Sequence, residues 1–189
     1  LSPDLPVSID TFRSSVAARA IHKYGKVIIN DISAGELDPL IVDVAAEHDV
    51  PYVAMHMKGD PRTMQSMTDY RDIVAEVVDY FRERTAQLRE RGVRRIVVDP
   101  GFGFAKTLEQ NYELLRGLHR LAELGYPVLA GVSRKSMIYK LIGTTPAEAL
   151  NGTTALHWEC LRQGAVILRA HDTREAVEVV RMFDQFMQA

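Results

Sequence analysis

At six points along this sequence an apolar run ends in a polar or charged residue. These residues are Asp10, Asn30, His56, Asp99, Lys135, and Arg169 with His171. A carboxylate and an amide can together accept from and donate to the edge of a heterocycle, whereas lysine, arginine and histidine side chains favour an anion. If the chain brings these residues together, the site would suit a polar heterocycle that carries phosphate groups.

The clearest of these points follows the apolar run 96–98. The run stops at Asp99, and the stretch Pro100–Gly103 then turns the chain, because proline forbids ladder pairing and the glycines free the backbone. A partly buried carboxylate needs donors, which a guanidine-like heterocycle edge supplies in parallel. Two alternatives remain open. Asp99 could cap a plain turn, or it could pair with Lys135 or Arg169 and only hold the fold together.

Positive charge gathers at two further points. The stretch Ser133-Arg134-Lys135-Ser136 leads into a predicted helix, where backbone N–H groups and cations favour an anion; an exposed basic turn is the alternative. Arg169 and His171 end a predicted strand two residues apart, so both should point to one side and receive a phosphate or pyrophosphate. His56 lacks further ligands at metal-binding spacing and forms the site floor or is simply packed. Asp31 follows Asn30 and should point away from it, in a structural role.

The elements that must position these residues alternate between strand and helix. The predicted strands are 6–10, 27–31, 51–57, 95–99, 127–132 and 165–170. The predicted helices are 13–24, 39–48, 69–91, 108–124, 136–142, 146–163 and 173–187. The strands are continuous apolar runs, which indicates a parallel sheet covered on both faces. Because every strand ends in a polar residue, a barrel, whose strand ends ring one site, is favoured over an open doubly wound sheet.

The predicted fold class is therefore α/β, a TIM-type (β/α)₈ barrel with six of the eight βα units present. The 189 residues fit a single domain, 1–189. A complete barrel of this type takes about 250 residues. At roughly 30 residues for each βα unit, two units are expected outside this chain, so we expect the domain to be incomplete at its N-terminus.

Charge and composition exclude several classes of partner. The net charge is -2, so no overall field favours nucleic acid or an anionic membrane. No apolar run approaches the length of a membrane span and no signal peptide opens the sequence, so we expect a cytoplasmic location and no membrane contact. The single cysteine, Cys160, excludes an internal disulfide and is expected to be a small buried residue.

Six ordered motifs in the chain resemble those of the dihydropteroate synthase family, whose fold is a (β/α)₈ barrel. The motifs are Ser8-Ile9-Asp10-Thr11; Ile29-Asn30-Asp31; Met55-His56-Met57 with Gly59 and Pro61; Asp99-Pro100-Gly101-Phe102-Gly103-Phe104 with Lys106; Gly131-Val132-Ser133-Arg134-Lys135-Ser136; and Arg169-Ala170-His171-Asp172. The resemblance covers nearly the whole chain. The chain lacks the family's first strand and the second unit with its loop, so it resembles a member that begins at the third strand.

The resemblance implies a transferase of folate biosynthesis. Such an enzyme condenses 6-hydroxymethyl-7,8-dihydropterin pyrophosphate with p-aminobenzoate, giving 7,8-dihydropteroate and pyrophosphate. It implies catalytic roles for Asp10, Lys135, Arg169 and His171. It implies pterin binding by Asp10, Asn30, Asp99, Lys135 and Arg169. It implies a p-aminobenzoate pocket at Phe104 and Ser136, and pyrophosphate binding by Arg169 and His171.

The resemblance also implies Mg²⁺ on the pyrophosphate, with its protein ligand in the family's first loop, so no metal ligand is expected in this chain. A complete barrel is expected to form a homodimer, and this chain alone is expected to be inactive. Two alternatives stay open. A pterin-binding methyltransferase domain shares the barrel but has no need of Ser133–Ser136 or of the Arg169 and His171 pair, because no pyrophosphate leaves. An inactive pterin-binding paralogue is the other.

Overall fold

The computed structural model describes residues 5–59 and 62–188, so Pro61 of the third motif lies outside it. The strands are β1 Ser8–Asp10, β2 Ile28–Asp31, β3 Tyr52–Met55, β4 Ile96–Asp99, β5 Leu129–Ala130 and β6 Ile167–Leu168. The α-helices are α1 Ser14–Tyr24, α2 Leu40–Glu47, α3 Ile73–Glu90, α4 Leu108–Arg116, α5 His119–Ala122, α6 Ser136–Ile142, α7 Leu150–Arg162 and α8 Thr173–Gln188. Two short 3₁₀ helices, η1 Met64–Ser66 and η2 Pro146–Glu148, lie in loops.

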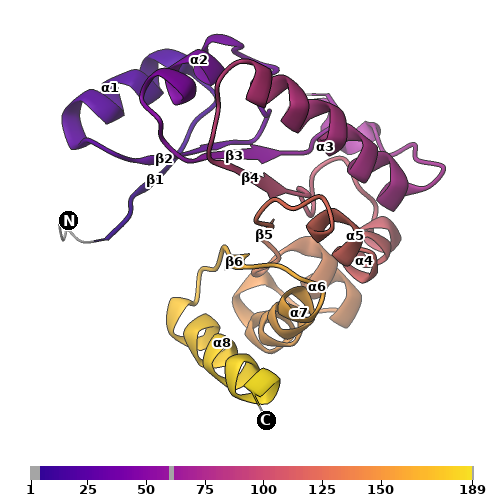
Figure 1. Cartoon of the computed structure of the whole chain (residues 1–189). Helices are drawn as coiled ribbons and strands as arrows, with labels where there is room; N and C mark the ends of the chain where they lie inside the picture. Colours follow the sequence, from indigo (N-terminus) through magenta and orange to yellow (C-terminus); the bar gives the residue numbers. More distant parts are fainter. Residues whose placement is uncertain (1–4, 60–61, 189) are drawn as a thin grey trace.

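The strands are parallel and follow one another in chain order. Strands β1 to β4 form one sheet, β5 pairs with β6, and the bridge between Val98 and Val128 joins the two groups. Figure 1 shows α1, α2 and α3 on the outer side of the curved sheet. The predicted TIM-type barrel is thus confirmed, and the chain carries six of its βα units.

Most predicted elements differ from the structure by a few residues at their ends. The helix expected over 146–163 is wrong as a single helix, since η2 ends at Glu148 and α7 begins at Leu150. The helix expected over 108–124 is wrong as a single helix, since α4 ends at Arg116 and α5 begins at His119. Gly117 ends α4 where the chain packs against Val74, whose methyl groups would lie 2.7 Å from a Cβ at that position. The last strand ends at Leu168, so the alternation that predicted Arg169 and His171 on one side of a strand does not extend to them.

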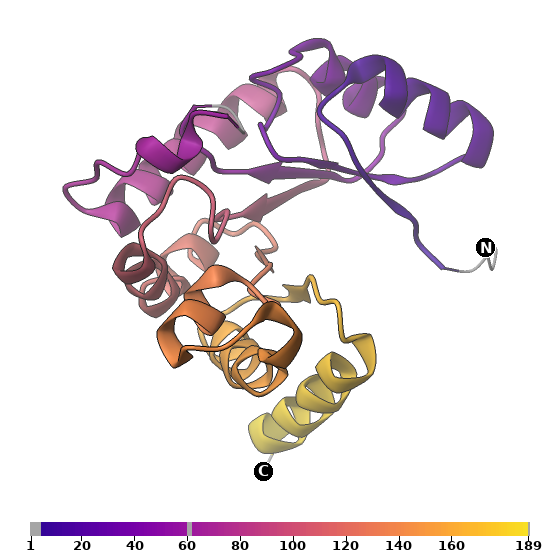
Figure 2. The ribbon, with the colours of Figure 1, turned by 180° about the vertical axis from the view of Figure 1, so that it is seen from behind.

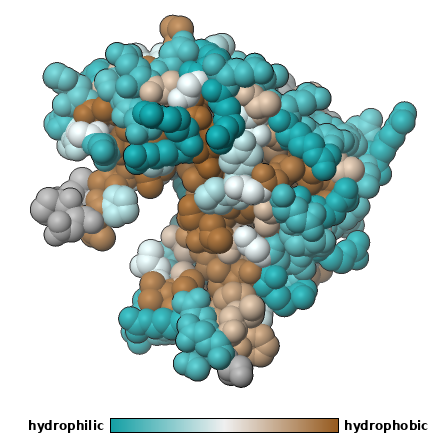
Figure 3. All heavy atoms as spheres, viewed as in Figure 1, coloured by the Kyte–Doolittle hydropathy of each residue, from teal (hydrophilic) through white to brown (hydrophobic). Residues whose placement is uncertain are grey.

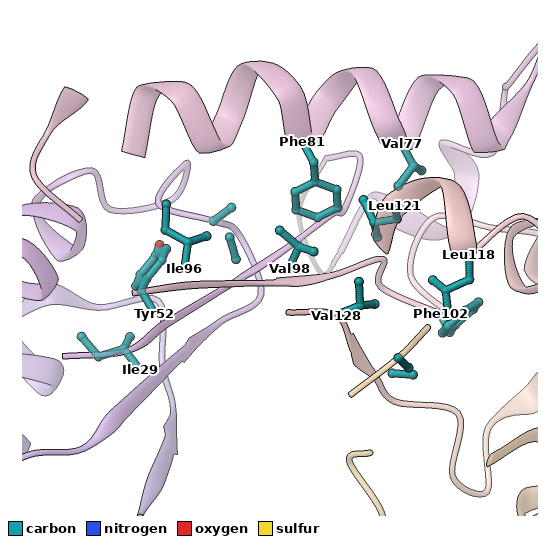
Figure 4. Close-up of a cluster of buried hydrophobic side chains, with 14 of the residues drawn as sticks. Ile29, Tyr52, Val77, Phe81, Ile96, Val98, Phe102, Leu118, Leu121 and Val128 are labelled. Atoms are coloured by element: carbon teal, nitrogen blue, oxygen red, sulfur yellow. The ribbon is translucent and has the colours of Figure 1, made fainter. Parts of the chain in front are cut away.

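The hydrophobic core lies between the sheet and its outer helices. Figure 4 shows Val77 and Phe81 of α3 above Val98 of β4, and all three side chains are buried. Tyr52 of β3 is also fully buried, and its hydroxyl donates a 2.6 Å hydrogen bond to Asp31. Each large side chain buried in this way contributes roughly 1.5–3 kcal/mol. Asp31 thus has the structural role predicted for it, on the helix side of the sheet.

The inner face of the sheet is open between β1 and β6. A cavity of about 440 Å³ lies there, lined largely by apolar side chains. It is bordered by Ile28, Val53, Val97, Leu129 and Ile167, together with Ser8, Asp10, Asn30, Pro51, Leu168 and Arg169. Figure 2 shows from behind that the ribbons of the first and last strands lie apart, and Figure 3 shows a hollow bordered by brown apolar residues. Across the described part of the chain, no helix combines the length and apolarity needed to cross a membrane.

The turn after β4 depends on glycine at position 101, and we expect Gly101→Ala to destabilise the protein. Gly101 has a φ of +68°, and a Cβ there would lie 2.1 Å from the carbonyl oxygen of His56. A left-handed conformation alone costs a non-glycine residue about 1–2 kcal/mol. Gly125→Ala is the matched control, because Gly125 also has a positive φ but open space around it. Urea unfolding should show a larger loss of stability for Gly101→Ala, and equal losses would contradict the expected clash.

Candidate active site

A cavity of about 210 Å³ lies at the carboxyl ends of the strands, where barrel enzymes carry their active sites. Six of the eight predicted site residues line it: Asp10, Asn30, Asp99, Phe104, Lys135 and Arg169. Ile32, Met55 and Gly131 complete the lining and were not predicted as site residues. The other two predicted residues, Ser136 and His171, are not among the lining residues. Ser136 begins α6 and His171 follows β6.

Asp10 connects the first and last strands of the chain. Its Oδ1 accepts a 2.6 Å hydrogen bond from Asn30 Nδ2, and its Oδ2 accepts one of 2.6 Å from Arg169 Nη2. The side chains of Asp10 and Arg169 are 58% and 51% exposed. An exposed ion pair of this kind contributes at most about 1 kcal/mol, so Arg169 can exchange Asp10 for another anion at little cost.

Asp99 is the buried carboxylate of the cavity, with 5% of its surface exposed. Its Oδ1 accepts a 2.8 Å hydrogen bond from the backbone N–H of Gly101. Burial raises the pKa of Asp99, and the positive charge of Lys135 opposes that rise. The ion pairs of residues 5–59 and 62–188 do not include Asp99, so neither Lys135 nor Arg169 bonds its carboxylate directly, although both charges favour its ionised form. Its remaining acceptor positions suit the donors of a ligand.

Lys135 precedes α6 and reaches back over the turn that follows β4. Its Nζ donates to the carbonyl oxygen of Phe102 and lies 5.0 Å from the centroid of the Phe104 ring. Burial lowers the pKa of Lys135, and the charge of Asp99 opposes that change. Arg134 instead makes two 2.8 Å hydrogen bonds with the carboxylate of Asp172. Of the two cations predicted at this turn, Lys135 therefore lines the cavity and Arg134 holds a loop in place.

His171 is bonded to Ser133, a buried residue three positions after β5. The backbone N–H of His171 donates to Ser133 Oγ at 3.1 Å, and Ser133 Oγ lies 2.9 Å from His171 Nδ1. A hydroxyl that accepts one bond can donate its proton to Nδ1, which leaves the proton of a neutral imidazole on Nε2. We infer that Ser133 presents His171 as an Nε2–H donor.

Ser133→Ala should therefore weaken the binding of inorganic pyrophosphate about fivefold to tenfold, as expected when a hydrogen bond of about 1 kcal/mol is lost. Calorimetry with pyrophosphate measures the affinity directly. Ser66→Ala, an exposed serine in η1, serves as the control and should bind as the unchanged protein does. If both variants bind equally well, Ser133 has no part in orienting His171 toward the anion.

His56 and Cys160 both lie in the interior rather than at the cavity. The His56 ring packs edge-on against Tyr80, with 4.9 Å between the ring centroids, which supports the packed alternative for this residue. Cys160 is buried, as predicted, and burial raises the pKa of its thiol to about 12. The thiolate that would act as a nucleophile is therefore scarce at neutral pH.

The described residues contain no cluster of side chains that would hold a metal ion by themselves. In residues 5–59 and 62–188, no group of three or more histidine, cysteine, aspartate and glutamate side chains could hold a metal ion. Mg²⁺ demands a near-octahedral set of oxygen ligands, often with one or two carboxylates. The exposed carboxylate of the cavity, Asp10, is already bonded to Asn30 and Arg169.

The fold and the cavity together are those of a barrel with a polar cavity at its strand ends, which is where barrel enzymes bind their ligands. A family model described as "Pterin binding enzyme" matches residues 1–171. The chain is 42% identical over 184 residues to a dihydropteroate synthase of Synechocystis sp., covering 96% of this chain and 63% of that protein. It is 40% identical over 185 residues to the dihydropteroate synthase of Escherichia coli K12, covering 97% of this chain and 65% of that protein.

Solved structures agree with these relatives. A Thermus thermophilus dihydropteroate synthase in complex with 6HMPPP matches at a TM-score of 0.90 and 41% identity, over 96% of this chain and 72% of that one. The same enzyme in complex with 4-aminobenzoate matches at a TM-score of 0.91 and 40% identity, over 96% of this chain and 74% of that one. Xanthomonas albilineans dihydropteroate synthase in complex with 7,8-dihydropteroate matches at a TM-score of 0.87 and 40% identity, over 98% of this chain and 68% of that one. The chain belongs to the dihydropteroate synthase family of pterin-binding enzymes, and it spans less than two thirds of the length of the two curated relatives.

Proposed function

We propose that the protein is a dihydropteroate synthase, a transferase that joins 6-hydroxymethyl-7,8-dihydropterin pyrophosphate to p-aminobenzoate in folate biosynthesis. The observation that carries the proposal is the single cavity in which Asp10, Asn30, Asp99, Lys135 and Arg169 meet. It is supported by relatives whose structures hold 6HMPPP, 4-aminobenzoate and 7,8-dihydropteroate. The roles below are those that the geometry of this cavity favours.

The pterin is held by the inner, buried part of the cavity. The Asp99 carboxylate accepts two parallel N–H donors of the pterin edge, as carboxylates do from guanidinium groups. Asn30 donates and accepts beside it, and Lys135 donates to the ring. Because Asp99 is buried, its hydrogen bonds to the ligand form in a medium that strengthens them.

The leaving pyrophosphate is received at the open side of the cavity. Arg169 releases Asp10 and donates to the pyrophosphate, with His171 as a second donor. Asp10 is then free to stabilise the positive charge that develops on the pterin methylene group as its C–O bond breaks. The p-aminobenzoate nitrogen forms the new C–N bond and loses a proton. The exchange of partners by Arg169 thus couples departure of the pyrophosphate to stabilisation of the carbon it leaves.

The p-aminobenzoate is placed beside Phe104, which lines the cavity, and near Ser136 at the start of α6. Mg²⁺ belongs to the proposal as a family expectation, and no described residue is assigned to it. The complete protein is further proposed to be a cytoplasmic homodimer. Light scattering of the full-length protein tests that assembly, and a monomer at working concentration would contradict it.

The test is the release of pyrophosphate from dihydropterin pyrophosphate by the full-length protein with Mg²⁺, with and without p-aminobenzoate. We expect release that requires p-aminobenzoate and yields 7,8-dihydropteroate. Pterin binding without condensation would identify an inactive paralogue instead. Methyl transfer to or from a pterin would identify a methyltransferase. That reaction releases no pyrophosphate, so it would not require Arg169 to exchange Asp10 for an anion.

A further inference from the structure

A lysine that the proposed mechanism does not use lies buried beside the cavity. Lys106 is 6% exposed, and its Nζ has three partners. It donates to the carbonyl oxygens of Gly101 and Phe104, both at 2.9 Å, and lies 3.2 Å from Nδ1 of His56. As an ammonium group, Lys106 has three donors and no acceptor, and in that state Nδ1 of His56 accepts the third bond.

Lys106 directly follows a loop that carries the cavity residue Phe104. We call residues 100–105, between Asp99 and Lys106, the Phe104 loop. The Phe104 N–H donates to the Gly101 carbonyl at 3.1 Å, and Lys135 donates to the Phe102 carbonyl. The loop contains three residues with positive φ, Gly101, Gly103 and Ala105, so its backbone conformation is not the one most residues prefer. Two of its carbonyls point inward to the same ammonium group.

His56 gives this ammonium group a fixed support. Its backbone N–H donates to the Asp99 carbonyl at 2.9 Å, and its ring packs against Tyr80 and Phe81. Burial and the charge of Lys106 hold the pKa of His56 well below its usual range, so the ring is neutral and Nδ1 can accept. The contact therefore ties the Phe104 loop to β3 and β4 rather than to solvent.

We propose that Lys106 is a positioning residue that fixes the Phe104 loop and thereby sets the place of the Phe104 ring at the p-aminobenzoate side of the cavity. The inference rests on the proposed function for its substrate and on the contacts of Lys106 for its mechanism. Lys106 does not line the cavity, and it acts on the substrate through Phe104.

Stability alone does not account for a lysine at this position. Burial is the main cause that lowers the pKa of Lys106 to about 7. The negative charge of Asp99 raises this pKa, and the positive charges of Lys135 and Lys58 lower it further. A buried cation is unfavourable for folding, and a methionine of similar length would fill the same space without that cost. A methionine would, however, take the Lys106 donor from both loop carbonyls, which leaves the Gly101 carbonyl with only the bond from the Phe104 N–H.

The test compares Lys106→Met with Lys140→Met, a control at an exposed lysine of α6, in the full-length protein. Hydrogen exchange of the Gly103 and Phe104 amides measures how well ordered the Phe104 loop is, and it does not depend on enzymatic activity. Steady-state kinetics then give KM for each substrate. Lys106→Gln, which keeps donors on a shorter side chain, is a second variant that reads the same loop if Lys106→Met fails to fold.

We expect Lys106→Met to keep or raise the thermal midpoint while the two amides exchange about tenfold faster, the factor that corresponds to loss of a hydrogen bond to a charged group. KM for p-aminobenzoate should rise about tenfold, with pterin affinity changed less than about twofold. Lys106→Gln should lie between, and Lys140→Met should match the unchanged protein. Unchanged loop exchange in Lys106→Met, or equal effects on both substrates, would overturn the proposal. Absence of condensation by the unchanged protein would instead overturn the proposed function. The hydrogen exchange of the Gly103 and Phe104 amides would then still test whether Lys106 fixes the Phe104 loop.

Discussion

Asp99→Asn is expected to weaken pterin binding by roughly one to two orders of magnitude, which corresponds to the approximately 1–3 kcal/mol cost of an unmatched buried polar group. The amide oxygen of the variant can keep the 2.8 Å bond from the Gly101 N–H. The amide nitrogen then takes the other position, where it presents donors to the donors of the pterin edge. The shape of the site is retained and its hydrogen-bonding pattern is reversed.

Calorimetry with a pterin ligand, on a polypeptide that carries the complete barrel, measures this effect. Asp184→Asn is the control, because Asp184 is an exposed aspartate of α8 far along the chain from the site. Thermal unfolding of both variants shows whether any loss of affinity reflects a loss of fold. Full pterin affinity in a folded Asp99→Asn protein would remove Asp99 from the binding site.

The arrangement of the strand ends could be predicted from the sequence because parallel strands bring their carboxyl ends to one edge. A polar residue that ends an apolar run is therefore placed by the run itself. Asp10, Asn30 and Asp99 were predicted in this way, and the structure brings them to one cavity. The pairing of Asp10 with Arg169 was not predicted, since it joins residues 159 positions apart and depends on how far the sheet curves.

The role of Lys106 could not be predicted for a different reason. Lysine is rarely buried, so a lysine in a loop is expected to face solvent. Its burial results from the loop carbonyls that turn toward it, and no sequence period reports the direction of a carbonyl. The break between α4 and α5 was missed similarly, because an isolated glycine in a helical pattern is often tolerated and the contact of Gly117 with Val74 is a tertiary one.

A polypeptide of residues 1–189 alone is expected to give no measurable pyrophosphate release. Its inner sheet face opens into the 440 Å³ cavity between β1 and β6, and Val166 and Ile167 are 66% and 38% exposed. Each large core side chain left in water forgoes roughly 1.5–3 kcal/mol, against a total stability of about 5–15 kcal/mol for a domain. The unpaired edges of β1 and β6 also invite association with other chains.

The measurement compares this polypeptide with one extended at its N-terminus by two further βα units, with both substrates and Mg²⁺ present. We expect turnover from the longer polypeptide only. Light scattering should show the shorter one associating as its concentration rises, because apolar faces and strand edges are exposed together. Binding of a pterin by the shorter polypeptide would be weaker but present, since Asp99 and Asn30 remain buried within the described fold. Comparable rates of pyrophosphate release from the two polypeptides would show that six βα units suffice for catalysis.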